Sequence, residues 1–314
     1  TGTRASRSLL LHSSVREDYS SFWFAVKRMP RKARESKGKL GKVRERLKAR
    51  KAREVRESNG EQEKARESKG KISFAFLCVL CGEIVMKAMI LAAGRGERMR
   101  PLTDVTPKPL LEAGGKPLIV WHIEKLARAG YTELVINHAH LGDKLEAALG
   151  DGNRFGVSIR YSPEREALET AGGIANAMPL LGPEPFLVVN GDIFCDYDFT
   201  ALPHELGELS AWLVLVNNPD HHPNGDFELR QGKVLDDGEH KLTFSGIGIY
   251  RPELFAAIAR GSKARLAPLL REQMAVGRVG GVHHRGLWLD IGTPQRLHAL
   301  DGLLRNSGRE VHSE

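Results

Sequence analysis

A glycine-rich loop that carries several cations is the strongest chemical feature of this 314-residue sequence. The loop reads LAAGRGERMRPLTDVTPKPL over residues 91–110 and follows a short apolar stretch. Glycines at the end of a strand let successive backbone N–H groups converge on an anion. Arg98 and Lys108, with Arg95 and Arg100, add positive charge to the same loop. This combination predicts a binding site for a polyphosphate.

Two common phosphate-binding patterns do not fit this loop. A dinucleotide-binding loop needs G-x-G-x-x-G, but Met99 stands three residues after Gly96. A P-loop needs Gly-Lys-Ser/Thr, but Lys116 is followed by Pro117. The loop ends instead in Pro-Lys-Pro, and the flanking prolines restrict the backbone so that Lys108 is held in one direction.

Two aspartates follow apolar segments elsewhere in the chain. Asp192 comes just after FLVVN at 186–190, a run typical of a strand buried on both faces, and Asp290 ends the segment 287–290. Either aspartate alone would be read as a turn or helix-cap residue. Ligands of open α/β sheets gather beyond the carboxyl ends of the strands, and carboxylates there are natural ligands of Mg²⁺. Together with the cationic loop, the pair predicts a metal site.

The elements that must position these residues alternate between strand and helix from residue 86 onward. Strands are expected at 87–92, 132–137, 157–161, 186–190, 211–217, 226–230, 242–250 and 287–290. Helices are expected at 118–129, 141–149, 252–259 and 266–275, with two more beginning near Thr170 and Pro294. This order predicts a mainly parallel sheet with helices on both sides, extended after residue 200 by a mixed or antiparallel portion.

Residues 1–85 differ in composition from residues 86–314. The first segment carries 22 of the 47 Lys and Arg residues but only 10 of the 39 Asp and Glu residues, and it repeats KARESKGK at 32–39 and 64–71. Such a polar stretch cannot bury enough apolar surface to fold. It is interpreted as a disordered linker, a nucleic-acid-binding tail or a non-native extension. The remaining 229 residues form one domain of ordinary size, with no nucleic-acid role expected for it.

Composition restricts the class and the compartment. Hydrophobic residues make up 41% and charged residues 27%, which is close to globular averages, and no apolar run reaches the roughly 18 residues of a membrane span. Three cysteines, Cys78, Cys81 and Cys195, are too few for a disulfide scaffold, so a reducing, cytoplasmic compartment is expected. The twelve histidines are interpreted as polar loop contacts, and Cys195 as a small buried residue.

The motifs together resemble the signature of the sugar-1-phosphate nucleotidyltransferases. The resemblance includes the loop at 91–103, Pro107-Lys108-Pro109, Asn190-Gly191-Asp192 and Trp288-Leu289-Asp290-Ile291-Gly292-Thr293, and covers residues 86–314. It implies a single Rossmann-like (GT-A-like) α/β domain with a mainly parallel mixed sheet flanked by helices. It also implies the reaction of a nucleoside triphosphate with a sugar-1-phosphate, aided by Mg²⁺, to give a nucleotide-sugar and pyrophosphate.

The resemblance implies roles for particular residues. Arg98 and Lys108 are the expected catalytic residues, and Asp192 and Asp290 the expected metal ligands. The expected nucleotide-binding residues are Leu91, Ala93, Gly94, Gly96, Glu97, Arg98, Lys108, Glu164, Thr170 and Gly172. The expected sugar-phosphate-binding residues are Asn190, Asp226 and Gly246.

The segment 163–173 resembles the turn with which the family recognises the nucleotide base. Mannose-1-phosphate guanylyltransferases have Gly-Thr-Ala-Gly there, whereas this chain has Glu169 in place of the first glycine. Leu-Glu-Thr-x-Gly-Gly, with His221-His222 and Phe244-Ser245-Gly246-Ile247, is more similar to the N-acetylmuramate-1-phosphate uridylyltransferases of bacterial peptidoglycan recycling. Guanylyl transfer to mannose-1-phosphate and thymidylyl or uridylyl transfer to glucose-1-phosphate stay open. A catalytically inactive regulatory module of the same fold is the alternative outside enzymes.

Overall fold

The computed structural model describes residues 86–310, and in 307–310 only the backbone. The chain divides into two units, Thr1–Ser73 and Phe74–Glu314, and the described residues all belong to the second. The three interpretations of residues 1–85 therefore lie outside the described residues, as do Cys78 and Cys81. No helix within 86–310 combines the length and the apolar character needed to cross a membrane.

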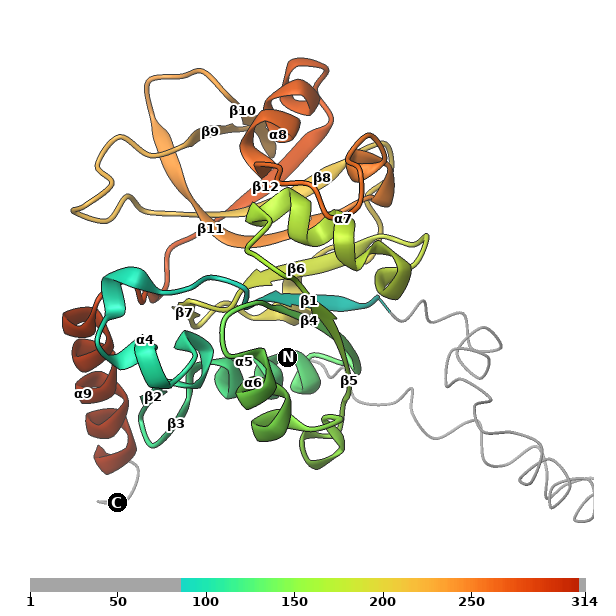
Figure 1. The fold of residues 1–314 in the computed structure, drawn as a ribbon. Coiled ribbons are helices and arrows are strands. Elements are labelled where there is room, and N and C mark those ends of the chain that lie inside the picture. Colours follow the sequence, from blue (N-terminus) through green and yellow to red (C-terminus); the bar gives the residue numbers. More distant parts are fainter. Residues whose placement is uncertain (1–85, 311–314) are drawn as a thin grey trace, which may run out of the picture. The chain divides into compact units, whose positions relative to one another are not determined.

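The described residues form an α/β fold around one large sheet (Figure 1). The strands are β1 (Ala88–Leu91), β2 (Glu112–Ala113), β3 (Lys116–Pro117), β4 (Glu133–His138), β5 (Ser158–Pro163), β6 (Phe186–Asn190), β7 (Ile193–Cys195), β8 (Ala211–Val216), β9 (Phe227–Arg230), β10 (Lys233–Leu235), β11 (Lys241–Tyr250), β12 (Val279–His284) and β13 (Trp288–Asp290). The α-helices are α4 (Leu102–Val105), α5 (Leu118–Arg128), α6 (Gly142–Leu149), α7 (Glu169–Leu181), α8 (Leu266–Ala275) and α9 (Pro294–Glu310). Short 3₁₀ helices η2 (Glu97–Met99), η3 (Lys108–Leu110), η4 (Asn153–Phe155), η5 (Phe199–Ala201) and η6 (Pro252–Phe255) connect them.

The large sheet has nine strands in the order β5-β4-β1-β6-β11-β8-β12-β10-β9 and is mixed, as expected. Strands β5, β4, β1 and β6 run parallel, because helices return the chain to the same edge between them. Strand β11 is antiparallel to both β6 and β8, and β10 is antiparallel to β9 and β12. The parallel half therefore has all its carboxyl ends at one edge.

Helices cover both faces of the sheet (Figure 1). In β1, Ala88 and Ile90 join a buried cluster with α5 and α6, whereas Met89 joins a second cluster with α7 and α8. The same alternation occurs in β6, where Leu187 and Val189 face the first cluster. Successive side chains of a strand point to opposite faces. The uninterrupted apolar run of β6 thus follows from burial on both faces.

A two-stranded ladder lies beside the main sheet and supports the site. Strand β7 pairs with β13 in antiparallel register, with Ile193 opposite Asp290. A third buried cluster underlies this ladder and α9 and includes Met99, Phe194 and Ile291. This arrangement packs β13 and α9 against the glycine loop, which lies nearly 200 residues earlier in the sequence.

The expected elements are largely confirmed, but the helix at 252–259 is shorter than expected, and several short elements were not expected, namely α4, β2, β3, β7, β10 and β12. Residues 252–259 were expected to be a helix, but only η6 at Pro252–Phe255 forms, and the chain then turns. Strand β12 was not expected, because Gly280 and Gly281 weaken its strand pattern. A Cβ on Gly280 would lie 2.7 Å from the Trp212 ring and one on Gly281 2.7 Å from the Leu213 carbonyl oxygen, so close packing against β8 requires both glycines.

Candidate active site

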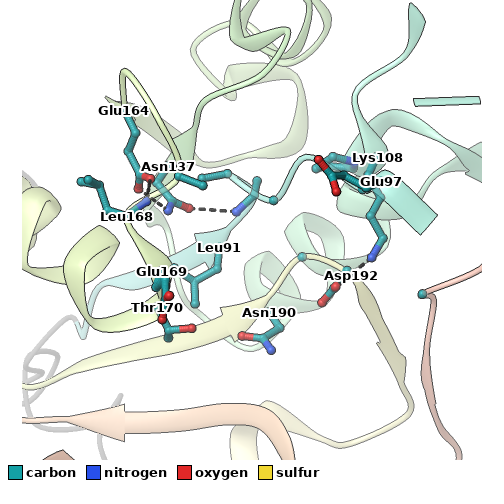
Figure 2. A pocket seen from close by; sticks show the side chains of 18 of the residues that line it. Leu91, Glu97, Lys108, Asn137, Glu164, Leu168, Glu169, Thr170, Asn190 and Asp192 are labelled. Carbon is teal, nitrogen blue, oxygen red and sulfur yellow. Dashed lines mark hydrogen bonds and ion pairs between the residues drawn. The ribbon is translucent and has the colours of Figure 1, made fainter. Parts of the chain in front are cut away.

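A cavity of about 460 Å³ lies at the carboxyl ends of β1, β4 and β6 (Figure 2). We call it the first cavity. Eleven residues that the sequence predicted for the site line it: Leu91, Ala93, Gly94, Gly96, Glu97, Arg98, Lys108, Glu164, Thr170, Asn190 and Asp192. The remaining four, Gly172, Asp226, Gly246 and Asp290, do not line it. The ends of parallel strands therefore assemble most of the predicted residues around one space.

The glycine loop has its shape for steric reasons. Gly96 has φ +67°, and a Cβ at that position would lie 2.9 Å from Thr103 Cγ2. The Thr103 hydroxyl donates to the Gly96 carbonyl oxygen at 2.8 Å and so closes the loop. Gly94, in contrast, has no atom within 4 Å of an added Cβ, so its surface opens into the cavity. The loop thus leaves room for a ligand to approach its backbone closely.

Lys108 reaches across the first cavity to Asp192. Its Nζ donates to Asp192 Oδ2 at 2.8 Å, and the two side chains are 8% and 48% exposed. Lys108 is buried because η3 follows the fixed backbone of Pro107 and points the side chain inward. Asp192 follows β6 and remains half open to solvent. A cation and a carboxylate, which the sequence separates by 84 residues, therefore face each other at the cavity (Figure 2).

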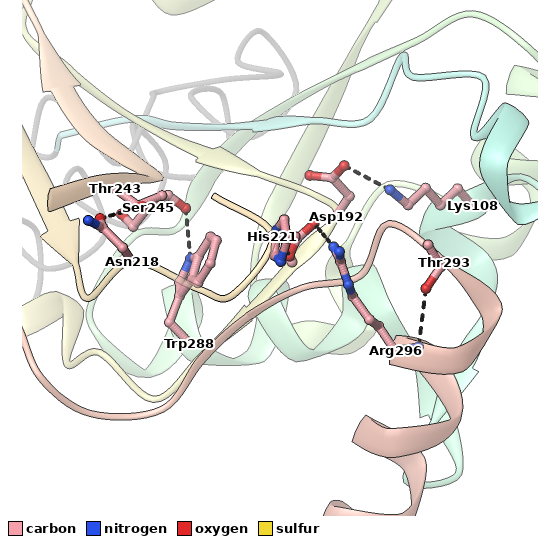
Figure 3. Close-up of polar contacts among 10 residues, drawn as sticks. Lys108, Asp192, Asn218, His221, Thr243, Ser245, Trp288, Thr293 and Arg296 are labelled. Atoms are coloured by element: carbon pink, nitrogen blue, oxygen red, sulfur yellow. Dashed lines mark hydrogen bonds and ion pairs between the residues drawn. The ribbon is translucent and has the colours of Figure 1, made fainter. Parts of the chain in front are cut away.

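Asp290 lies next to Asp192 along the β7–β13 ladder. Its register partner is Ile193, and the Ile291 backbone N–H donates to the Asp192 carbonyl oxygen at 2.7 Å. The Asp290 carboxylate has two nitrogen-bearing neighbours: His221, with Nε2 at 3.0 Å from Oδ1, and Arg296, with an ion pair to Oδ2 (Figure 3). The two predicted metal ligands thus come from adjacent strands.

Arg98 belongs to the same group of charges. A Cβ added to Gly292 would lie 3.1 Å from Arg98 Nη2, 3.1 Å from Asp290 Oδ2 and 3.4 Å from Arg296 Nη1. The three side chains therefore all lie close to Gly292, where a larger residue would crowd them. The site therefore contains several cations around its two carboxylates, a distribution suited to a polyphosphate and its counter-ion.

Asn137 was not predicted from the sequence, yet it joins two parts of the first cavity. Its Oδ1 accepts from the Ala92 backbone N–H at 2.8 Å, and its Nδ2 donates to Glu164 Oε1 at 2.7 Å. Glu164 Oε2 in turn accepts from the Leu168 N–H at 2.9 Å. Burial raises the pKa of the Glu164 carboxyl despite these hydrogen bonds. The only signal in the sequence was a polar residue near the end of an apolar strand.

Glu169 and Gly172 shape the start of α7. Glu169 has φ +60°, a left-handed conformation that favours glycine, which explains why related chains can place glycine there. Gly172 lies behind the cavity wall, where a Cβ would lie 2.3 Å from the Ser262 carbonyl oxygen. Its N–H donates to the Ala264 carbonyl oxygen at 3.1 Å. The glycine thus lets the loop 261–265 pack on α7.

A second cavity of about 270 Å³ adjoins the first. Asn190 and Asp226, two of the residues expected to bind the sugar phosphate, line it. Asp226 Oδ2 accepts from the Phe244 N–H at 2.8 Å, and Oδ1 lies 3.1 Å from His222 Nε2. Gly246, the third such residue, does not line it; a Cβ there would lie 2.5 Å from the Asn190 amide nitrogen, so Gly246 makes room for that side chain.

The histidines and Cys195 have polar or buried settings in the described residues. His138 contacts Glu146 at 2.6 Å, His283 contacts Asn217 at 2.9 Å, and His284 contacts Asp196 at 2.7 Å. The three polar contacts were expected, but the loop setting was wrong, because His138 ends β4 and His283 and His284 end β12. Cys195 is buried, as expected, and burial raises the pKa of its thiol to about 11.

Comparison with known proteins identifies the class. A family model described as nucleotidyl transferase matches residues 87–229. The chain is 59% identical over 226 residues to N-acetylmuramate alpha-1-phosphate uridylyltransferase of Neisseria meningitidis, covering 69% of this chain and 98% of that protein. It is 30% identical over 242 residues to mannose-1-phosphate guanyltransferase beta-A of Xenopus laevis, covering 73% of this chain and 67% of that protein.

A solved structure agrees with the sequence comparisons. A putative glucose-1-phosphate thymidylyltransferase from Bacillus anthracis superposes with a TM-score of 0.64 at 25% identity, covering 70% of this chain and 96% of that one. The chain therefore belongs to the nucleotidyl transferase family. It is a sugar-1-phosphate nucleotidyltransferase, and its family transfers nucleotidyl groups from nucleoside triphosphates to sugar-1-phosphates.

Proposed function

We propose that the protein transfers the uridylyl group of UTP to N-acetylmuramate-1-phosphate and releases pyrophosphate. The uridylyltransferase of Neisseria meningitidis supports the choice of substrates, because almost the whole length of that protein is similar to this chain. The observation that carries the chemistry is the pair between Lys108, at the end of the glycine loop, and Asp192, beyond β6, in the wall of the first cavity. We place the activity in the cytoplasm of a bacterium, in the reuse of peptidoglycan sugars.

Magnesium fits the donor set at the strand ends. Asp192 and Asp290 supply carboxylate oxygens from adjacent strands, which suits a hard cation that also takes phosphate oxygens as ligands. These two residues would hold the ion, with Asp192 half exposed at the cavity. When bound, Mg²⁺ would reduce the repulsion between two anionic substrates and stabilise charge on the phosphate oxygens.

The cations of the chain would bind and orient the triphosphate. Lys108 and Arg98 line the first cavity next to the glycine loop and would balance the charge of the β- and γ-phosphates. The backbone of the loop at Gly94 allows the phosphates to come close. Glu164 and Asn137, at the opposite part of the cavity, would hold the base end. Catalysis would rest on positioning and electrostatics, with no protein nucleophile.

The acceptor would lie toward the second cavity. An oxygen of the sugar phosphate would attack the α-phosphorus, forming one P–O bond as the bond to the bridging oxygen of pyrophosphate breaks. Asn190 lines both cavities and would contact the sugar where the two substrates meet. Asp226, fixed by the Phe244 N–H, would accept hydrogen bonds from sugar hydroxyl or amide groups.

Pyrophosphate release by the full-length chain with Mg²⁺ tests this function. The assay combines UTP, GTP, dTTP and CTP with the 1-phosphates of N-acetylmuramate, N-acetylglucosamine, glucose and mannose. We expect turnover with UTP and N-acetylmuramate-1-phosphate well above every other pair. Turnover with GTP and mannose-1-phosphate instead would overturn the substrate assignment but keep the class. A folded protein that is inactive with all pairs would indicate the regulatory module.

A further inference from the structure

The second cavity continues the first on the side where the acceptor is expected. Glu169, Thr170 and Asn190 line both, and Figure 2 shows the three near one another in the first cavity. A sugar whose phosphate lies in the first cavity therefore extends its far substituents into the second. The residues that line only the second cavity are then the ones that distinguish one sugar from another.

Arg265 is the one cation among the residues that line the second cavity. It precedes the first turn of α8, and its side chain is 79% exposed. Its Nε donates to Glu169 Oε2 at 3.1 Å, and no other partner of its guanidinium occurs among the described residues. The four N–H donors of the two terminal nitrogens are therefore free to bind a ligand, and their planar arrangement matches a carboxylate.

Glu169 pairs with this arginine although its own backbone conformation is unfavourable. Its φ of +60° would suit glycine better, yet the chain has a glutamate whose carboxylate pairs with Arg265. Backbone hydrogen bonds fix the two partners relative to each other, since the Ala264 N–H donates to the Leu168 carbonyl oxygen at 3.1 Å and the Gly172 N–H donates to Ala264. A side chain retained at such a position indicates a role for its carboxylate.

We propose that Arg265, positioned by Glu169, binds a carboxylate on the acceptor sugar and thereby selects N-acetylmuramate-1-phosphate. This inference rests on the proposed function. N-acetylmuramate differs from N-acetylglucosamine by a lactyl ether on O3, which adds one methyl group and one carboxylate. The two sugars are otherwise the same, so a guanidinium in the acceptor cavity is the group that can tell them apart.

The surroundings of Arg265 suit a lactyl group. The other acidic residue of the second cavity, Asp226, already has hydrogen-bond partners: its Oδ2 accepts from the Phe244 N–H, and its Oδ1 lies 3.1 Å from His222 Nε2. Phe227, Phe244 and Leu270 offer apolar surface to the methyl group. The first turn of α8 has no side-chain cap, and Leu266 and Ala267 of that turn line the cavity. Its partial positive charge adds to that of Arg265.

The test compares two acceptors with UTP in the full-length protein. The quantity measured is the kcat/KM for N-acetylmuramate-1-phosphate divided by that for N-acetylglucosamine-1-phosphate. In Arg265→Gln we expect this ratio to fall by about 10- to 100-fold, through the KM for N-acetylmuramate-1-phosphate, because a hydrogen-bonded charge pair is lost. The ratio for Arg265→Lys should lie between those of wild type and Arg265→Gln, since lysine keeps the charge but not the paired donors. Glu169→Gln should lower the ratio by about two- to fivefold.

Arg305→Gln is the matched control. Arg305 also pairs with one carboxylate, that of Asp301 at 2.8 Å on α9, but it lines neither cavity, so the ratio should stay unchanged. An unchanged ratio in Arg265→Gln, an equal loss with both sugars or a wild-type ratio near one would each overturn the inference while leaving uridylyl transfer intact. A wild-type protein that turns over other sugars but not N-acetylmuramate-1-phosphate would overturn the proposed function and the inference with it.

Discussion

The two cavities are built in different ways. Most of the cationic wall of the first comes from one stretch, residues 91–110, whose glycines and 3₁₀ turns lie beyond a parallel strand. The second cavity collects single residues from separate elements, among them Glu169 of α7, Asn190 of β6, Phe244 of β11 and Arg265 before α8. The cationic wall of the first cavity is therefore encoded by a contiguous motif, whereas the rest of that cavity and the second cavity depend on the packing of the fold.

This difference separates the reaction from its specificity. Phosphate binding needs backbone N–H groups and fixed charges, which a short loop supplies. Discrimination between sugars needs a few side chains at particular places, and any sheet with the same topology can offer different ones. We expect substitutions around the first cavity to change turnover by the same factor with every acceptor sugar, and substitutions in the second to change the ratio between acceptor sugars.

The largest effect is expected from Asp192→Asn. Asparagine keeps an oxygen that accepts from Lys108 but loses the charge at the predicted metal site. Turnover should fall by at least about 10²-fold with every acceptor, since stabilisation of the phosphate charges is lost. Pyrophosphate release measures this. Asp198→Asn is the control, because Asp198 only caps η5 by accepting from the Thr200 N–H, and its turnover should match wild type. If the loss of turnover in Asp192→Asn differed tenfold between acceptor sugars, the separation of reaction from specificity would be contradicted.

The second prediction concerns pH and the region beneath the first cavity. His122 is buried on α5 next to the Ile193 carbonyl oxygen at 2.8 Å, and burial lowers its pKa from 6.5 to about 4. The folded state therefore favours the neutral ring. Stability from this residue is complete above pH 6.5 and is lost as the pH falls toward 4, by roughly 3 kcal/mol in total. Urea unfolding of wild type and His122→Gln at several pH values measures the difference.

A histidine outside both cavities and nearer the surface should not give this dependence. Burial also lowers the pKa of His283 on β12, but that ring lies at the surface near Asn217. His283→Gln should leave the pH dependence of the unfolding free energy nearly as in wild type. If His283→Gln removed the dependence and His122→Gln did not, the buried histidine would be the wrong origin.

A third effect is expected at Asn137. Asn137→Ala removes two buried hydrogen bonds, to the Ala92 N–H and to Glu164, and should lower the free energy of unfolding by about 2 kcal/mol. The KM for UTP should rise while that for the sugar phosphate stays unchanged. Denaturant unfolding and steady-state kinetics measure the two effects. Asn217→Ala, at an exposed contact on the acceptor side, should cost less than about 0.5 kcal/mol.

The smallest effect has the opposite sign. Glu169→Gly should raise the free energy of unfolding by up to about 1 kcal/mol, because glycine accepts φ +60° without strain and the lost pair is exposed. The same variant should lose selectivity for N-acetylmuramate-1-phosphate. Gly96→Ala provides the contrast in the first cavity, where φ +67° and the contact with Thr103 should make the change destabilising. A destabilised Glu169→Gly would show that its backbone conformation is not strained.

The sequence predicted the fold where periodicity and turn residues agree. The strand at 186–190 and the helix at 266–275 were predicted with the bounds that the structure has. A strand buried on both faces is apolar throughout, whereas a helix buried on one face has apolar residues at helical spacing, so the two patterns are distinct. The glycine loop and Asp192 were likewise predicted, because they belong to local sequence motifs. Asn137, His221 and Arg296 were not, because their roles depend on strands and helices that meet only in the folded chain. The short strands β7 and β12 were missed for lack of length or side chains.

The pairing of β7 with β13 has a consequence for the order in which the protein becomes functional. Ile193 and Asp290 meet only when both strands are present, so the second carboxylate arrives with one of the last strands to leave the ribosome. A nascent chain that ends at residue 285 already contains every strand of the nine-stranded sheet and the whole glycine loop, but lacks Asp290. Translation thus supplies every strand of the large sheet before it supplies the second carboxylate of the site.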